Sequence, residues 1–313
     1  MASTWSDDAA PGSGVSRADE RRRRLRAQMR SDSPVVAVGA HDAMSARLIE
    51  AYGFDAVWVS GFGVSSMAYG VPDLNLVTMT ETLDVTRRIS AVTDLPVVVD
   101  CDNGYGGLSN VVRTAVEFDR AGVAAICVED NLFPKRNSLY QGQTHRDLVK
   151  TSEQARRLRA AKAAQESPDF VLIARVEALI AGHGVDAACE RAVAYADAGA
   201  DAILIHSKDK TLWEIETFLE QWHRTGISTP LVAVPTLFPD FTATELHTKG
   251  FSMVILANQP MRASVQAMED TLAVLRAEGK PAAADGRIAK VDHIFELVHT
   301  REEIEREESG GLG

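Results

Sequence analysis

Eight short runs of apolar residues recur along the chain at regular intervals, and each run is rich in valine and isoleucine. The runs are apolar throughout, a pattern typical of parallel strands that are covered on both faces. We therefore predict eight buried strands, at Val35–Ala40, Ala56–Ser60, Pro96–Asp100, Ala124–Glu129, Phe170–Arg175, Ala202–His206, Pro230–Pro235 and Met253–Ala257.

Segments with helical periodicity lie between these runs. Several end in a glycine just before the next run, as in AYGFDAVWV and DAGADAILI, and glycine is typical of helix C-termini. The predicted helices are Ala43–Tyr52, Glu81–Val92, Leu108–Arg120, Ser152–Ala164, Val185–Ala198, Leu212–Arg224, Thr242–Thr248 and Met261–Ala277.

Eight strand–helix units in roughly 245 residues predict an α/β fold of the (β/α)8 TIM-barrel type. A doubly wound open sheet is the alternative. Its first strand should lead into a G-x-G-x-x-G turn, whereas this chain reads GAHDAM there. We expect the catalytic barrel at residues 31–285, an Arg-rich N-terminal extension at 1–30, and a C-terminal helical extension and tail at 286–313. Both extensions could pack on a neighbouring subunit, and Glu302–Gly313 should be frayed.

Composition narrows the class of protein. The 313 residues are 45% hydrophobic, which is enough for a large core, and no run of 18 apolar residues predicts a membrane span. The chain opens with a polar, Arg-rich segment rather than a signal peptide. Cys101, Cys127 and Cys189 lack paired spacing, which argues against a disulfide scaffold or structural zinc site and suits a reducing cytoplasm.

The net charge of −11 is unevenly spread. The first 30 residues hold seven arginines and four acidic residues, which leaves 26 basic and 40 acidic residues, a net charge of −14, for the rest. Such a body argues against nucleic-acid binding. The Arg21–Arg24 run suggests either a nucleic-acid arm or the solvated face of a helix. Leu25 and Met29, spaced i and i+4, favour the helix face.

Acidic residues stand where two predicted strands end, and catalytic residues of such barrels lie at the C-terminal strand ends. Asp100 and Asp102 are spaced i and i+2, so both should project toward the barrel mouth, and Glu129 lies at the same level of the next strand. Three carboxylates without thiolates or several imidazoles suit a hard cation, Mg²⁺ first and Mn²⁺ second. Capping or salt-bridge roles are the alternative.

Basic and polar residues complete the predicted site. Arg175 offers a planar fork for an oxyanion, and His206 can donate or accept a proton near neutral pH. The loop from Asn131 to about Lys150 lacks clear periodicity, which is typical of a lid or binding loop. Its polar residues suit phosphoryl oxygens, although a solvated basic loop is the alternative reading; they are Lys135, Arg136, Asn137 and Ser138.

The segment Glu129–Ser138, EDNLFPKRNS, resembles the E-D-K-x-F-P-K-x-N-S signature of the phosphoenolpyruvate mutases, in the isocitrate lyase/phosphoenolpyruvate mutase superfamily. The similarity runs from about Val35 to Leu275. Supporting motifs are Ser60-Gly61, GVPD ending at Asp73, DCDNGYG from Asp100, ARVEALIAG around Arg175, IHSK around His206, and Ala257-Asn258.

The resemblance implies roles for these positions. Asp100 would bind Mg²⁺ directly, whereas Asp102, Glu129 and Asp73 would act largely through metal-bound water. Ser60 and the backbone of Gly61 would contact the pyruvyl group, and Arg175 and His206 the phosphoryl unit. Lys135 and Asn137 would close over it from the lid, and Trp58 would line the pocket. We also expect four residues within or next to these motifs to bind substrate, namely Phe62, Ser138, Glu177 and Asn258.

The implied reaction interconverts phosphoenolpyruvate and 3-phosphonopyruvate, with a small anionic pyruvyl phosphate or phosphonate as substrate and neither nucleic acid nor membrane as partner. A loose, metaphosphate-like transition state needs positioning and positive charge, and water must be kept out. The resemblance also implies a last barrel helix exchanged between subunits, in a homodimer or in a homotetramer built as a dimer of dimers.

Related activities remain as alternatives. Phosphonopyruvate hydrolases share most motifs but tend to carry Thr in the lid, so Asn137 favours the mutase. The C–C lyases carry K-[KR]-C-G-H with a catalytic Cys, which this chain lacks; Cys101 should point into packing. A non-catalytic binding protein is disfavoured because none of the expected acids, Arg175 or His206 is lost. One departure is Asn131 in place of the signature Lys. It is either a tolerated change or the mark of a related pyruvyl oxyanion or phosphonate substrate.

Overall fold

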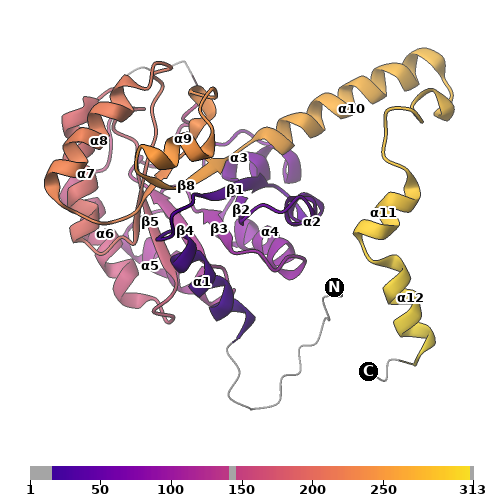
Figure 1. Ribbon diagram of the computed structural model, residues 1–313, viewed down its shortest axis with the longest axis horizontal. Helices are drawn as coiled ribbons and strands as arrows, with labels where there is room; N and C mark the ends of the chain where they lie inside the picture. Colours follow the sequence, from indigo (N-terminus) through magenta and orange to yellow (C-terminus); the bar gives the residue numbers. More distant parts are fainter. Residues whose placement is uncertain (1–15, 141–145, 311–313) are drawn as a thin grey trace.

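The computed structural model describes residues 16–140 and 146–310, and in it eight parallel strands close into a barrel (Figure 1). Each strand pairs with the next along the chain, and β8 pairs with β1. The predicted barrel is therefore confirmed. The strands are β1 Val35–Ala40, β2 Ala56–Val59, β3 Val97–Asp100, β4 Ala125–Glu129, β5 Val171–Val176, β6 Ala202–Ile205, β7 Leu231–Ala233 and β8 Phe251–Leu256.

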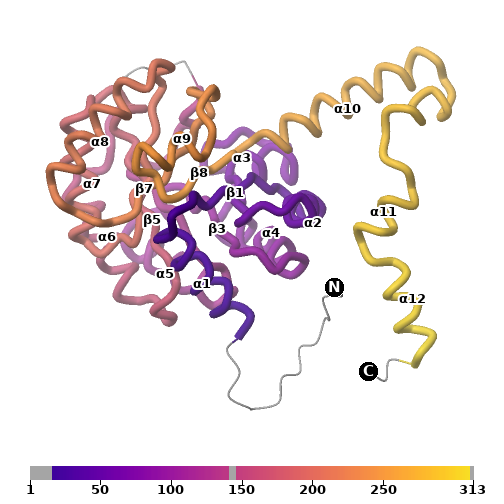
Figure 2. Tube along the Cα trace, in the orientation of Figure 1, coloured from indigo at the N-terminus to yellow at the C-terminus, as the bar shows by residue number. Residues whose placement is uncertain are grey.

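Helices follow the strands and surround the barrel (Figures 1 and 2). The α-helices predicted between strands are α2 Ala43–Ala51, α4 Met79–Ala91, α5 Leu108–Arg120, α6 Thr151–Ala164, α7 Gly184–Asp197, α8 Trp213–Thr225 and α9 Ala243–Thr248, with α10 Gln259–Glu278 after β8. In the described part of the chain, four short elements were not predicted, two of them the 3-10 helices η2 Pro235–Leu237 and η3 Pro281–Ala283. A three-residue helix, α3 Gly61–Gly63, and a π-helix, η1 Val64–Ala68, follow β2 and lead the chain over the barrel mouth.

The core has two layers because successive strand residues point to opposite faces. Trp58 belongs to the cluster inside the barrel, whereas Val57 and Val59 pack outward against the helices. Cys101 is fully buried in the outer layer, as expected, and all three cysteines are buried and free. Leu25 of helix α1 (Arg17–Gln28) joins the inner cluster, so α1 closes one end of the barrel.

Helix α1 corrects the prediction of a solvated arginine face. Arg21 and Arg22 are buried, with 6% of each residue exposed. Arg22 Nη2 pairs with Asp119 Oδ1 at 2.8 Å, and Arg22 Nε donates to the carbonyl of Val123 at 3.1 Å. Arg23 and Arg24 are exposed as predicted, Arg23 with 58% of its side chain exposed. Arg21 and Arg22 are buried because the end of the barrel presents backbone carbonyls and a carboxylate to this helix.

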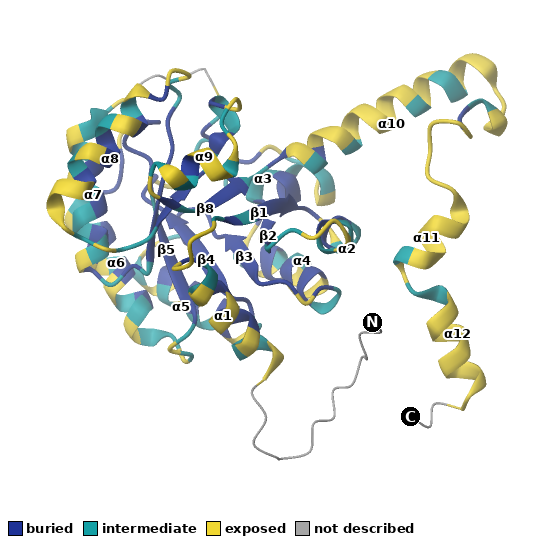
Figure 3. Ribbon diagram, viewed as in Figure 1, coloured by how far each residue is buried: buried dark blue, intermediate teal, exposed yellow. Residues whose placement is uncertain are grey.

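Helix α10 runs away from the barrel, and the chain then continues through α11 Val291–Leu297 and α12 Thr300–Glu308 (Figures 1 and 3). The prediction that the chain frays from Glu302 is wrong as far as Glu308, because these residues belong to α12. The last three residues lie outside the described part of the chain. Within the described residues, no helix combines the length and the hydropathy that crossing a membrane requires.

Candidate active site

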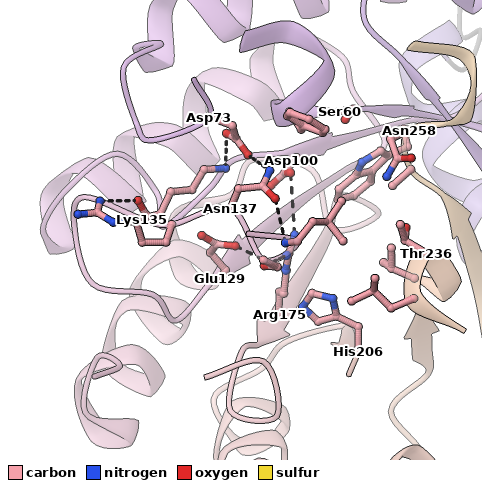
Figure 4. Close-up of a pocket in the computed structure, with 18 of the residues that line it drawn as sticks. Ser60, Asp73, Asp100, Glu129, Lys135, Asn137, Arg175, His206, Thr236 and Asn258 are labelled. Carbon is pink, nitrogen blue, oxygen red and sulfur yellow. Dashed lines mark hydrogen bonds and ion pairs between the residues drawn. The ribbon is translucent and has the colours of Figure 1, made fainter. Parts of the chain in front are cut away.

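A small cavity of about 70 Å³ lies at the barrel mouth, where the C-terminal ends of the strands meet (Figure 4). Two sides of it differ in character. Carboxylates and the lid lysine lie on one side, and Arg175 and His206 on another. Most of the predicted site residues line it, namely Trp58, Ser60, Phe62, Asp73, Asp100, Glu129, Lys135, Asn137, Ser138, Arg175, His206 and Asn258.

Three predicted site residues do not line the cavity: Gly61, Asp102 and Glu177. Asp102 lies behind the wall because β3 ends at Asp100 and Asp102 has a left-handed backbone, with φ of 48°. The strand rule that placed Asp100 and Asp102 on one side therefore does not extend to Asp102. Glu177 is fully buried behind Arg175 and His206.

Lys135 connects the lid to the acidic side of the site. Its Nζ lies 2.8 Å from Asp73 Oδ1 and also forms an ion pair with Asp102. Burial disfavours the charge on Lys135, but these two carboxylates outweigh burial and raise its pKa well above the ordinary value. Burial also raises the pKa of Asp102 to about 6, against the attraction of Lys135. Asn75 supports the pair by donating its amide to Asp102 Oδ2 at 2.9 Å.

Glu129 ends β4 and is 2% exposed. Its partners are Arg175, whose Nε lies 3.5 Å from Oε2, and Asn131, whose Nδ2 donates to Oε1 at 2.9 Å. Burial raises the pKa of Glu129 to about 8, because the attraction of Arg175 opposes it only in part and Glu177 adds repulsion. Asn131 thus gives this carboxylate a hydrogen bond without the charge of the signature lysine.

The acids fit a cation that binds mainly through water. Within the described ranges, no three histidine, cysteine, aspartate or glutamate side chains lie close enough together to ligate one metal ion directly. Asp100, Glu129 and Asp73 nevertheless face the same cavity and are each less than 10% exposed. Such a buried set of oxygen donors suits Mg²⁺, which usually keeps several waters in its shell.

Ser60 lines the cavity, and Gly61 lies directly behind it. Ser60 follows β2 and accepts the backbone N–H of Gly63 at 3.1 Å, which starts helix α3. A Cβ on Gly61 would lie 3.2 Å from Asp100 Oδ2 and from Asp102 Oδ1. Glycine therefore allows this backbone to pass close to the carboxylates, which a larger residue would crowd.

Arg175 and His206 are held by one carboxylate, that of Glu177. Arg175 Nε donates to Glu177 Oε1 at 2.7 Å, and His206 Nε2 lies 2.6 Å from the same oxygen. Burial opposes ionisation of Glu177, but Arg175 and His206 lower its pKa well below the ordinary value. Burial lowers the pKa of His206. Because an ionised carboxylate only accepts, a neutral His206 donates through Nε2 and keeps Nδ1 as an acceptor.

The first part of the lid, residues 131–140, is its outgoing limb, and it contacts both the acidic and the basic side of the cavity. Asn137 Nδ2 donates to Asp73 Oδ2 at 2.7 Å, while Asn137 Oδ1 accepts the backbone N–H of Leu139 at 2.9 Å. Ser138 Oγ donates to Glu177 Oε2 at 2.9 Å and accepts from Arg175 Nη2 at 2.8 Å. The lid therefore contacts the acidic and the basic sides through adjacent residues.

Sequence reasoning missed part of the wall. Val234, Thr236 and Leu237 line the cavity after β7, and Thr236 faces it beside His206 (Figure 4). No charged residue marks this strand end, so only its position after a predicted strand could have indicated it. Asn75 was also missed, because an isolated asparagine in a loop gives no signal of its contact with Asp102.

Comparison with known proteins gives consistent relatives. Residues 25–276 match the family described as phosphoenolpyruvate phosphomutase. The chain is 39% identical to a phosphonopyruvate hydrolase of Variovorax sp. (strain Pal2), over 87% of this chain and 93% of the relative. It is 38% identical to a phosphoenolpyruvate phosphomutase of Tetrahymena pyriformis, over 82% of this chain and 84% of the relative.

Solved structures agree with these matches. A phosphoenolpyruvate phosphomutase from Streptomyces platensis subsp. rosaceus superposes with a TM-score of 0.88 at 40% identity, covering 92% of this chain and 98% of that one. A phosphonopyruvate hydrolase in complex with oxalate and Mg²⁺ gives a TM-score of 0.84 at 37% identity over the same shares. With the family match spanning most of the barrel, this chain belongs to the phosphoenolpyruvate mutase family of the phosphoenolpyruvate mutase/isocitrate lyase superfamily.

Proposed function

We propose that this protein is a Mg²⁺-dependent phosphoenolpyruvate mutase that interconverts phosphoenolpyruvate and 3-phosphonopyruvate. The observation that carries the proposal is Asn137, whose amide bridges the lid backbone at Leu139 and the carboxylate of Asp73 over the cavity. In the motif that the segment resembles, hydrolases tend to carry Thr at this lid position, so the amide favours the mutase.

The acidic side of the cavity supports a magnesium site. Asp100, Glu129 and Asp73 all line the cavity. The related hydrolase that holds Mg²⁺ together with oxalate supports the same choice of metal here. Bound Mg²⁺ would stabilise negative charge on the pyruvyl oxygens.

Different residues of the chain then bind the two parts of the substrate. Ser60 and the backbone at Gly61 orient the pyruvyl group, while Arg175 and Lys135 bring positive charge to the phosphoryl oxygens. From phosphonopyruvate, the P–C bond breaks and its electron pair stays on the pyruvyl unit as the enolate. The enolate oxygen then takes the phosphoryl group as the P–O bond forms, and no net proton is exchanged. His206 donates to Glu177, which also accepts from Arg175, and this shared carboxylate holds both side chains in place.

Phosphonopyruvate hydrolysis is the second candidate, because a hydrolase is as similar to this chain as the mutases are. In hydrolysis, water takes the phosphoryl group and C3 of the enolate gains a proton to give pyruvate. The two reactions share the first bond cleavage. What decides between them is whether the lid excludes water while the phosphoryl group is between its two positions.

We also propose that the chain works as a homodimer or a homotetramer built as a dimer of dimers, with helix α10 exchanged between subunits. Val265, Met268 and Leu272 follow each other along α10 and are 38%, 47% and 64% exposed. An apolar groove lined by Leu48 and Tyr52, among others, lies on the barrel at the base of α10. Docking of a second copy's α10 there would cover both surfaces. Light scattering after size exclusion gives the oligomeric mass.

The test of the activity is ³¹P NMR of phosphonopyruvate incubated with the protein and Mg²⁺. Growth of the phosphoenolpyruvate resonance supports the mutase. Growth of inorganic phosphate, with pyruvate, would instead establish the hydrolase, and no turnover of either kind would contradict both assignments.

A further inference from the structure

The described residues of the lid after residue 145 form its return limb. This limb carries an arginine, Arg146, to which neither the motif nor the proposed reaction gives a role. Arg146 lies in the described part of the loop, and 9% of its side chain is exposed. Its backbone is fixed to the loop after β5, because its N–H donates to the carbonyl of Ala181 at 3.1 Å and its carbonyl lies 2.6 Å from His183 Nε2. The Arg146 side chain therefore extends from a fixed backbone position toward the outgoing limb of the lid.

The two ends of its guanidinium bind two different segments. Nη1 donates to the carbonyl of Arg136, on the outgoing limb of the lid, at 2.9 Å. Nη2 donates to Glu177 Oε2 at 3.2 Å. One side chain thus ties the outgoing limb to the carboxylate behind the active site.

Glu177 joins these contacts to the groups that act on substrate. Its Oε2 accepts from Arg146 and from Ser138 of the lid, whereas its Oε1 holds Arg175 and His206. The carboxylate is fully buried, so bulk solvent does not reach its oxygens. One carboxylate, that of Glu177, therefore holds the lid in place and also positions Arg175 and His206.

We propose that Arg146 is a positioning residue that clamps the outgoing limb of the lid onto Glu177, and that it thereby limits loss of the phosphoryl group to water. The proposal rests on the mutase function proposed above. Only a planar fork spans both acceptors, since lysine presents its charge at a single point. Loss of the clamp would leave the lid free to open while the phosphoryl group is between enolate carbon and oxygen.

The test compares Arg146→Gln and Arg146→Lys with wild type and with Arg157→Gln. Arg157 is a control because its ion pair with Glu153 lies within α6, after the lid. In ³¹P NMR of phosphonopyruvate turnover, we expect Arg146→Gln to raise the ratio of phosphate to phosphoenolpyruvate about tenfold, the scale of a hydrogen bond to a charged group. Arg146→Lys should restore part of the wild-type ratio, and Arg157→Gln all of it.

A second readout needs no turnover. Tyr140 on the lid is 64% exposed and offers a chymotrypsin site. Oxalate with Mg²⁺ should protect Tyr140 from cleavage in wild type and in Arg157→Gln, but not in Arg146→Gln. If Arg146→Gln does not fold, Arg146→Lys carries both measurements and should show intermediate values.

The outcomes separate the clamp from the reaction. Wild type that releases only phosphate would overturn the mutase function, and loss of protection at Tyr140 in the variants would still support the clamp. Unchanged protection of Tyr140 in Arg146→Gln would overturn the clamp whatever the products are. If the wild type is a mutase, an unchanged ratio of phosphate to phosphoenolpyruvate in Arg146→Gln would overturn the clamp as well.

Discussion

Asn131 Nδ2 donates to Glu129 Oε1 across 2.9 Å, at the position where the resembling signature carries a lysine. The amide satisfies one oxygen of a buried carboxylate but brings no charge to it. Burial therefore prevails over the attraction of Arg175, and the pKa of Glu129 rises to about 8. The change alters the electrostatics of the acidic side without removing any of its carboxylates.

This relationship predicts how Mg²⁺ binding depends on pH. Glu129, at about 8, and Asp102, at about 6, must lose protons when the cation binds, so Mg²⁺ affinity should rise about tenfold or more from pH 6 to pH 8. Without metal, these raised pKa values contribute stability at low pH that is lost as pH rises toward 8. The Mg²⁺-induced rise in melting temperature should therefore be larger at pH 8 than at pH 6.

The matched variant is Asn131→Lys, which places a positive charge beside Glu129 and lowers its pKa. The gain in the Mg²⁺-induced shift should then occur at lower pH than in wild type. An equal shift at pH 6 and pH 8 in the wild-type protein would show that the acids do not titrate with the metal.

Asp100 provides the next prediction. Asp100→Ala should lower turnover about a hundredfold or more and abolish the Mg²⁺-induced thermal shift, because it removes the carboxylate proposed to bind the cation directly. The metal-free melting temperature should not fall, since fewer like charges then crowd the mouth. Asp84→Ala on α4, an exposed acid paired with Arg88, is the control. A Mg²⁺ response that survives in Asp100→Ala would place the metal elsewhere.

Asn137 is the lid residue that we expect to separate transfer from hydrolysis. Asn137→Ala loses the hydrogen bonds to Asp73 and to the Leu139 backbone, and should lower the mutase rate about tenfold to a hundredfold with little change in melting temperature. Asn137→Thr should increase the share of phosphate among the products. Full mutase rate in Asn137→Ala would refute the role given to the lid.

Helix α1 supplies a prediction about stability alone. Arg22→Ala removes one partner of a buried ion pair with Asp119, which should lower the free energy of unfolding by about 3 kcal/mol. Arg23→Ala, at an exposed pair with Asp169, should change it by less than about 1 kcal/mol. Urea unfolding measures both values. Similar losses in the two variants would contradict the account of α1, and neither should alter turnover where the protein is folded.

The strands could be predicted because strands that are buried on both faces consist of consecutive apolar residues. The end of each run then located the mouth, which is why Asp100, Glu129, Arg175 and His206 could be named from the sequence, and all four line the cavity. The position of Asp102 could not be predicted in this way, because its left-handed φ takes the backbone out of the strand pattern.

Other features could not be predicted for physical reasons. Arg21 and Arg22 were expected to be solvated because charge usually marks a surface, yet carbonyls and Asp119 at the barrel end make their burial favourable. Thr236 was missed because an uncharged residue after β7 does not stand out. The period of α10 predicts a helix with an apolar side, but it does not say that the helix leaves its own barrel.

We propose that the site moves a phosphoryl group between carbon and oxygen of a pyruvyl unit. The most direct measurement is ³¹P NMR of phosphonopyruvate with the protein and Mg²⁺, followed over time. We expect a phosphoenolpyruvate resonance that grows as phosphonopyruvate declines, with little inorganic phosphate. Phosphate without phosphoenolpyruvate, or no change in the spectrum, would contradict it.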